Sequence, residues 1–136
     1  MMLQELPRTQ SAPDQARITD AEAQAMVRAV IRLFERWQLS DGQAREILGG
    51  VAARTYARWK AGDIGRIDRD LATRLSLLMG IHKGLRYLFS DPERGYAWVS
   101  KPNPAFDGQS PVEIMADGDI FSLARMRAWL DAGRSG

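Results

Sequence analysis

The chain has 136 residues, a formal net charge of +2, no cysteine and one histidine. These counts exclude disulfides, thiolate catalysis, cysteine zinc sites and metal sites built from several histidines. No apolar run approaches the roughly 20 residues that a membrane span needs, and the N-terminus lacks the apolar core of a signal peptide. We therefore expect a cytoplasmic protein without membrane association, metal or cofactor.

The first segment, residues 1–17, carries Pro7, Pro13 and many small polar residues, so we expect a flexible tail there. Thr19 and Glu22 follow with the spacing of a capping box. Apolar residues then recur at helical spacing. The pattern predicts an amphipathic helix from Thr19 to about residue 37.

The next segment has the plan of a helix-turn-helix. Ser40 and Gln43 repeat the capping-box spacing and open a second, short helix. The pair Gly49–Gly50 ends that helix, because glycine readily adopts the left-handed conformation of a helix C-terminus. A third helix is expected over residues 52–61, stopped by Gly62.

The third helix is expected to have two different faces. The inner face, at 100° per residue, carries Ala52, Tyr56 and Trp59. Arg54, Thr55 and Arg58 fall on the opposite side, where a DNA major groove could receive them, and Lys60 is placed for phosphates. The charged residues between Gly49 and Gly62 are all basic. A plain helical hairpin with a solvated basic face fits the same pattern.

A long fourth helix is expected from Asp68, a capping residue, to the sequence Asp91-Pro92. Leucines recur along it at steps of three and four residues. Gly80 and Gly84 are candidate positions for a break in it. His82 lies on the apolar stripe, so we interpret it as a packed, hydrogen-bonded histidine without a functional role.

Residues 91–136 are expected to form short helices around an irregular loop. A helix is expected over residues 92–99, and the three prolines of residues 101–111 exclude a regular element there. Ser110 and Pro111 are typical of a helix start, and Gly118 follows that short helix as a breaker.

A last helix is expected over residues 119–132, with a loose tail at 133–136. Its expected buried residues are Ile120, Leu123, Met126, Trp129 and Leu130. Trp98 and Trp129 fit either the core or a protein interface, where tryptophan is enriched. No segment alternates with period two, so the sequence predicts an all-α fold.

The charge balance divides the chain into two parts. From Asp91 to Gly136 there are seven acids and five bases, whereas the helix-turn-helix is basic. A basic middle and a mildly acidic end suggest two different partners. We expect three regions: the tail 1–17, a helix-turn-helix domain 18–90 and a small helical module 91–136.

Two stretches carry a resemblance to a known family. "ILGGVAARTYARWKAG" resembles an Xre-like helix-turn-helix, and "KPNPAFDGQSPVEIM" resembles the opening of a toxin-binding domain. From about Thr19 to Gly136 the chain resembles the Xre/MbcA/ParS antitoxins, the partners of RES-domain toxins. The residues that carry the second likeness are Pro102, Asn103, Pro104, Phe106, Gly108 and Pro111.

The resemblance implies a function with two binding events. It implies a cytoplasmic homodimer that represses its own operon by binding operator DNA. When it is bound to the operator, the protein would be associated with the nucleoid. It also implies that the chain is not an enzyme. Its C-terminal module would neutralise a RES-domain toxin that consumes NAD or transfers ADP-ribose from it.

The resemblance places the end of the chain at or in the active-site cleft of the toxin. The candidate toxin-binding residues are Asn103, Phe106, Arg127, Trp129, Arg134, Ser135 and Gly136. Many relatives end in a glycine-aromatic tail, whereas this chain ends in "DAGRSG". Arg134 is the hypothetical plug here, because its guanidinium could meet carboxylates that otherwise serve the substrate.

Three other functions stay open from the sequence. One is a stand-alone helix-turn-helix transcriptional regulator whose C-terminal module dimerises or senses a ligand. Another is a protein-interaction adaptor that has lost DNA binding. The third, an enzyme, would need a carboxylate cluster in a pocket. A toxin gene adjoining this one favours the antitoxin.

Overall fold

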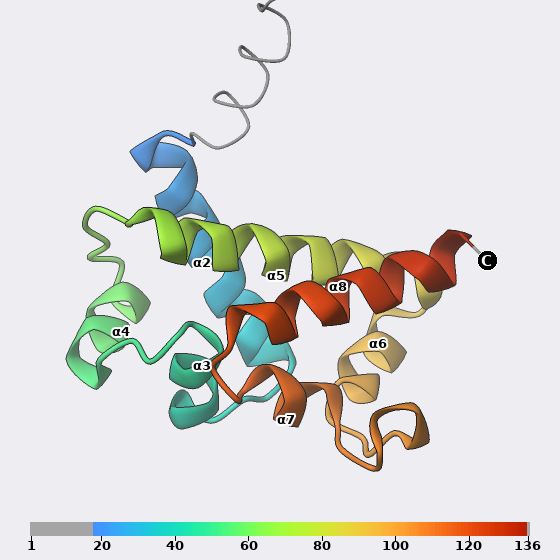
Figure 1. The fold of residues 1–136 in the computed structure, drawn as a ribbon. Helices are drawn as coiled ribbons and strands as arrows, with labels where there is room; N and C mark the ends of the chain where they lie inside the picture. The colour runs from blue at the N-terminus through green and yellow to red at the C-terminus, as the bar shows by residue number, and fades with distance from the viewer. Residues whose placement is uncertain (1–17, 136) are drawn as a thin grey trace, which may run out of the picture.

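The computed structural model describes residues 18–135, with only the backbone described for Arg134 and Ser135. The expected tail of residues 1–17 and the candidate residue Gly136 lie outside this range. Within it the chain forms seven α-helices and one 3-10 turn and no strand, which confirms the all-α prediction (Figure 1). None of these helices combines the length and apolar character that crossing a membrane requires.

The helices follow one another with short connections. In chain order they are α2 (Asp20–Arg36), α3 (Asp41–Ile47), α4 (Ala53–Lys60), α5 (Arg69–Leu88), α6 (Pro92–Trp98), the 3-10 turn η1 (Pro104–Phe106), α7 (Pro111–Met115) and α8 (Ile120–Ser135).

The helix starts are set by local hydrogen bonds that the sequence predicts. Thr19 and Ser40 each form a capping box with the residue three positions on, and Ser110 forms another with Glu113. Asp68 caps α5, its Oδ1 accepting the Leu71 amide at 2.9 Å. Each such cap stabilises its helix by about 1 kcal/mol.

Helix α5 is the centre of the fold. Helix α2 packs against it on one side, and α8 runs beside it in the same direction (Figure 1). The fully buried core joins residues of all three helices, including Val27, Leu75, Leu78 and Leu130. The helix-turn-helix and the C-terminal helices therefore rest on one shared core.

Gly80 and Gly84 are points of close approach between α5 and α8, and the suspected break near them is not found. A Cβ at Gly80 would lie 2.5 Å from Arg127 Cζ, and one at Gly84 would lie 3.0 Å from Leu130 Cβ. The glycines thus make room for α8. Each costs α5 about 1 kcal/mol of helix propensity, which the close packing offsets.

The end of α8 corrects one expectation. The helix does not stop at Ala132 but continues to Ser135, so residues 133–135 are helical and not loose. A Cβ at Gly133 would meet the Leu88 side chain at 3.6 Å, so α8 still packs against the end of α5 there. Packing across the helix pair outweighs the poor helix propensity of Gly133.

Two residues expected inside are exposed. Trp129 is 41% exposed, and the buried apolar positions of α8 are Leu123, Met126 and Leu130. Ala52 is exposed and serves as the N-cap of α4. The inner face of α4 therefore consists of aromatic residues alone.

We predict that Gly84→Val destabilises the protein by about 1–3 kcal/mol, the usual cost of forcing extra methyl groups into a packed interface. Urea unfolding would measure this free energy. Gly42→Val is the matched control, because a Cβ there would meet only Ser40 Oγ, at 3.8 Å. Equal losses in the two variants would contradict the close contact between α5 and α8.

Candidate functional site

The turn of the helix-turn-helix lies between α3 and α4. Gly49 and Gly50 have φ angles of +92° and +90°, as the sequence predicts for a helix-ending pair. The Gly50 amide donates to the Arg45 carbonyl at 2.8 Å, and Arg45 Nε donates to the Val51 carbonyl at 2.8 Å. Backbone and side chain of Arg45 together close the turn.

Arg74, a residue of α5, supports this turn, and the sequence analysis did not identify that role. Its side chain is buried, its Nη1 donates to the Ile47 carbonyl at 3.3 Å, and its Nε lies 3.2 Å from Asp70 Oδ2. A cation at a helix C-terminus also complements the helix dipole of α3. The one available signal is the Asp70–Arg74 spacing of four residues, which usually marks a mere surface pair.

Helix α4 has the two faces that its sequence predicts. Tyr56 and Trp59 are buried and anchor it, whereas Arg54 and Arg58 are exposed and Thr55 is half-buried. Burial, and then the charges of nearby acids, raise the pKa of Tyr56 to about 12, so its phenol stays neutral in the core. The exposed arginines are free to meet a partner.

Lys60 lies apart from the outer face of α4. Its Nζ lies 3.0 Å from Asp41 Oδ1 and 5.4 Å from the centroid of the Tyr56 ring. These contacts tie α4 to the start of α3. Because the pair is exposed, its contribution to stability is small.

A second candidate surface is an aromatic cluster formed by Phe89, Trp98, Phe106 and Trp129. The Trp98 and Trp129 rings stack with centroids 5.6 Å apart, and Phe106 meets Trp129 edge-on at 5.1 Å. The cluster joins α5, α6, η1 and α8. The fold thereby brings together two predicted toxin-binding residues that are distant in sequence, Phe106 and Trp129.

Asn103 holds the loop that carries Phe106. Its Oδ1 accepts the Ala105 amide at 2.9 Å, and its carbonyl accepts the Phe106 and Gly108 amides at 2.9 and 3.0 Å. The hydrogen bonds of Asn103 thus link the two ends of the proline-rich loop. Asn103 positions the aromatic cluster from within the loop.

The other predicted toxin-binding residues are placed differently. Arg127 leans over Gly80 on α5, with its Nε 3.6 Å from Asp131 Oδ2, so it lies outside the aromatic cluster. Arg134 and Ser135 belong to the last turn of α8. Phe121, at 66% exposure, is a large exposed apolar residue of α8 that sequence reasoning did not single out. The helical spacing of Phe121 from the buried Leu123 and Met126 was the available signal.

The acids around Gly118 form a boundary between α7 and α8. Asp117 accepts the Asp119 amide at 2.8 Å and the Ser122 hydroxyl at 2.7 Å. The Ser122 and Asp119 hydrogen bonds lower the pKa of Asp117. Over residues 18–135, no three of the His, Asp and Glu side chains are grouped so as to hold a metal ion.

Two family models match the chain in succession. Residues 16–80 match the antitoxin Xre-like helix-turn-helix domain, and residues 84–136 match the antitoxin Xre/MbcA/ParS C-terminal toxin-binding domain. The chain belongs to the Xre/MbcA/ParS antitoxin family. The two matches meet inside α5, at the glycines against which α8 packs. The antitoxin is therefore a member of a regulatory family rather than a catalytic one.

A curated relative and a solved structure extend this result. The uncharacterized protein y4oB of Sinorhizobium fredii (strain NBRC 101917 / NGR234) is 36% identical over 116 residues, which are 85% of the antitoxin and 89% of that protein. The crystal structure of the M. tuberculosis MbcT–MbcA toxin–antitoxin complex contains a chain with the same fold, at a TM-score of 0.56 and 22% identity. The match covers 83% of the antitoxin and 94% of that chain.

We predict that Gly49→Ala destabilises the antitoxin more than Gly50→Ala. Both substitutions force an L residue into the left-handed region, at about 1–2 kcal/mol. A Cβ at Gly49 would also lie 2.8 Å from the buried Arg74 guanidinium, whereas one at Gly50 meets nothing within 4 Å. Thermal unfolding would compare the two. An equal or larger loss at Gly50 would refute the support that Arg74 gives the turn.

Proposed function

We propose that the antitoxin neutralises a RES-domain toxin and, as a homodimer, represses its own operon by binding operator DNA. The observation that carries the proposal is the match of residues 84–136 to a toxin-binding domain whose surface here exposes Trp129. The RES class of the toxin rests on the family resemblance. Operator binding places the protein in the cytoplasm and, when bound, on the nucleoid.

Trp129 is the proposed anchor for the toxin. It is 41% exposed, yet Trp98 and Phe106 hold its ring on two sides. A large ring held in place before binding loses little conformational entropy on contact, which is why tryptophan dominates binding hot spots. Asn103 contributes by fixing the loop of Phe106.

The end of α8 is the proposed occluding element. Helix α8 runs to Ser135, so Arg134 and Ser135 belong to its last turn, and Gly136 follows them in the sequence. A guanidinium could pair with carboxylates of the toxin cleft through two parallel hydrogen bonds. Arg127, whose side chain is 44% exposed beside Asp131, is a candidate contact at the edge of this surface.

The proposed DNA contacts lie on α4. Arg54 and Arg58 are exposed on its outer face, with Thr55 beside them. The N-cap Ala52 has no side-chain hydrogen bond to the helix, so the first amides of α4 remain donors for a phosphate. Lys60 could reach a phosphate while it stays near Asp41, since an ammonium has three donors.

A homodimer would present two copies of α4 to a palindromic operator. The usual spacing of helix-turn-helix half-sites is about one DNA turn, or about 34 Å. Neutralising several phosphates makes such binding strongly dependent on salt.

We predict that Arg54→Ala and Arg58→Ala each weaken operator binding by about 1–3 kcal/mol, the usual value of a base contact. Fluorescence anisotropy with DNA from upstream of the gene would measure this, at two salt concentrations. Arg94→Ala is the matched control, because Arg94 is an exposed arginine on α6. Unchanged affinity in both α4 variants would show that α4 is not the recognition helix.

We predict different defects for two changes at the toxin surface. Trp129→Ala should weaken toxin binding by about 2 kcal/mol, or roughly 30-fold, as loss of a hot spot does. A chain that ends at Ala132 should still bind the toxin but no longer relieve its growth arrest. Titration calorimetry and growth after co-expression would separate the two effects.

Phe121→Ala is the control for Trp129, because it removes an exposed ring from the other end of α8. Loss of toxin binding in Phe121→Ala with full binding in Trp129→Ala would move the interface away from the aromatic cluster. Full neutralisation by the shortened chain would eliminate the occluding role of residues 133–136.

A further inference from the structure

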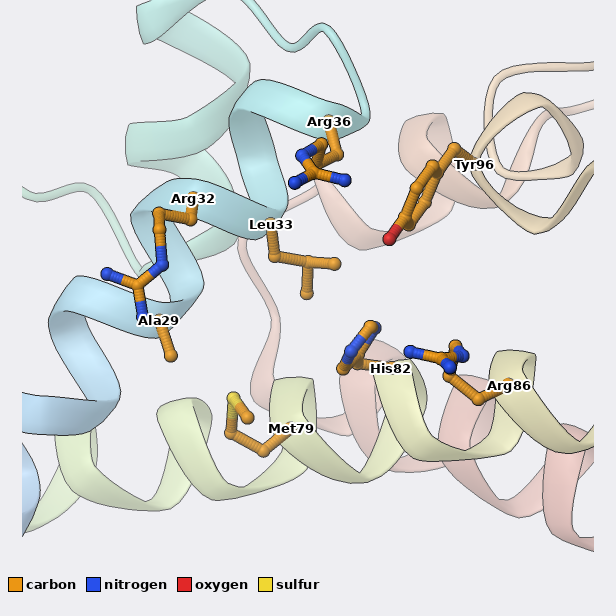
Figure 2. A pocket seen from close by; sticks show the side chains of 8 residues that line it. All are labelled: Ala29, Arg32, Leu33, Arg36, Met79, His82, Arg86 and Tyr96. Carbon is orange, nitrogen blue, oxygen red and sulfur yellow. The ribbon is translucent and has the colours of Figure 1, made fainter. Parts of the chain in front are cut away.

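Helices α2, α5 and α6 enclose a pocket of about 330 Å³ that has no part in the surfaces described above. Figure 2 shows the Arg36 and Arg86 guanidiniums, the His82 ring and the Tyr96 hydroxyl pointing toward one shared opening, with Arg32 farther along α2. The pocket is therefore lined by three cations contributed by two helices, beside a histidine and a phenol.

The pocket has a positively charged lining whose three arginines are all exposed. Its lining contains no aspartate or glutamate. The ion pairs of Lys60, Arg74 and Arg127 involve none of the pocket arginines. Arg36 lies over the Tyr96 ring, 5.9 Å from its centroid. Because these guanidiniums are exposed, water and salt screen their mutual repulsion, and Glu93 lines the adjoining hollow beside Arg36 and Tyr96. The guanidiniums therefore remain available to an anion.

His82 lines the same pocket, and one of its two ring nitrogens is buried and unsatisfied. It was expected to be a packed, hydrogen-bonded histidine, but its buried Nδ1 has no hydrogen-bond partner in the described part of the chain. Burial, and then the charge of Arg86, lower the pKa of His82, so the ring is neutral at pH 7. Because Nδ1 is enclosed, Nε2 is the nitrogen left for a ligand.

We propose that this pocket binds the phosphate group of a small molecule. Guanidiniums match phosphate oxygens through paired hydrogen bonds, and the Tyr96 hydroxyl and His82 Nε2 can add donors. The volume lies at the lower end of the range of small-molecule sites, roughly 300–1,000 Å³. Leu33 and Met79 supply an apolar wall for the organic part of the ligand.

The position of the pocket favours a small molecule over the backbone of duplex DNA. Helix α6, which carries Tyr96, and helix α4, which carries Arg54 and Arg58, lie toward opposite ends of α5 (Figure 1). The proposal is independent of the toxin and of the operator.

The test is titration of the full chain with inorganic phosphate, pyrophosphate and adenosine monophosphate. His82 is the one histidine of the sequence, so with any purification tag removed its ring gives a single assignable set of NMR signals. We expect saturable binding by calorimetry together with a shift of those signals. Tighter binding of the nucleotide than of both inorganic ions would identify an organic phosphate ester as the ligand class.

Arginine variants locate the site. Arg36→Gln and Arg86→Gln should each lower the affinity at least about tenfold. Arg94→Gln, which removes an exposed arginine of α6 outside the pocket, should leave it unchanged. Circular dichroism would verify that each variant is folded.

Three results would overturn the proposal. The first is no saturable binding of any probe at millimolar concentration. The second is an equal loss of affinity in Arg94→Gln, which would mean ordinary counter-ion binding to the surface. The third is a shift of the His82 signals by operator DNA alone, with none by the small probes, which would make the pocket a contact for the nucleic-acid backbone.

Discussion

The contact of α5 with α8 at Gly80 and Gly84 is the constraint on which the rest of the structure depends. Without side chains at these two positions, α8 lies close enough to bury Leu130 completely. The same α5 packs against α2, and its Arg74 reaches the carbonyl end of α3. One helix therefore supports the helix-turn-helix and the toxin-binding domain together, although the family models divide the chain within it.

Arginines lie in three different settings in this molecule, which differ in burial and in their neighbours. Arg74 is buried and paired, so it holds the turn between α3 and α4. Arg54 and Arg58 are exposed and unsupported, which suits contacts made only with a partner. The arginines around His82 converge on a pocket without an acid. Neighbouring groups, rather than residue type, distinguish structure from recognition here.

The sequence predicts the local features well and the long-range features poorly. The capping residues Thr19, Ser40 and Asp68 act on amides three positions away, so their spacing is sufficient to predict the helix starts. The exposure of Trp129 and the missing partner of His82 depend on which helices lie opposite, and periodicity carries no such information. For the same reason the sequence identifies Phe106 and Trp129 as candidates but not their contact.

The most direct test of the account is to co-express the chain with the adjoining gene, with a tag on this chain alone. If the chain neutralises a toxin, the neighbouring protein co-purifies in a stable complex and its growth arrest is relieved. Trp129→Ala would then reduce the recovery of the complex. A neighbour that neither arrests growth nor co-purifies would contradict toxin neutralisation and would leave a DNA-binding regulator resting on the helix-turn-helix alone.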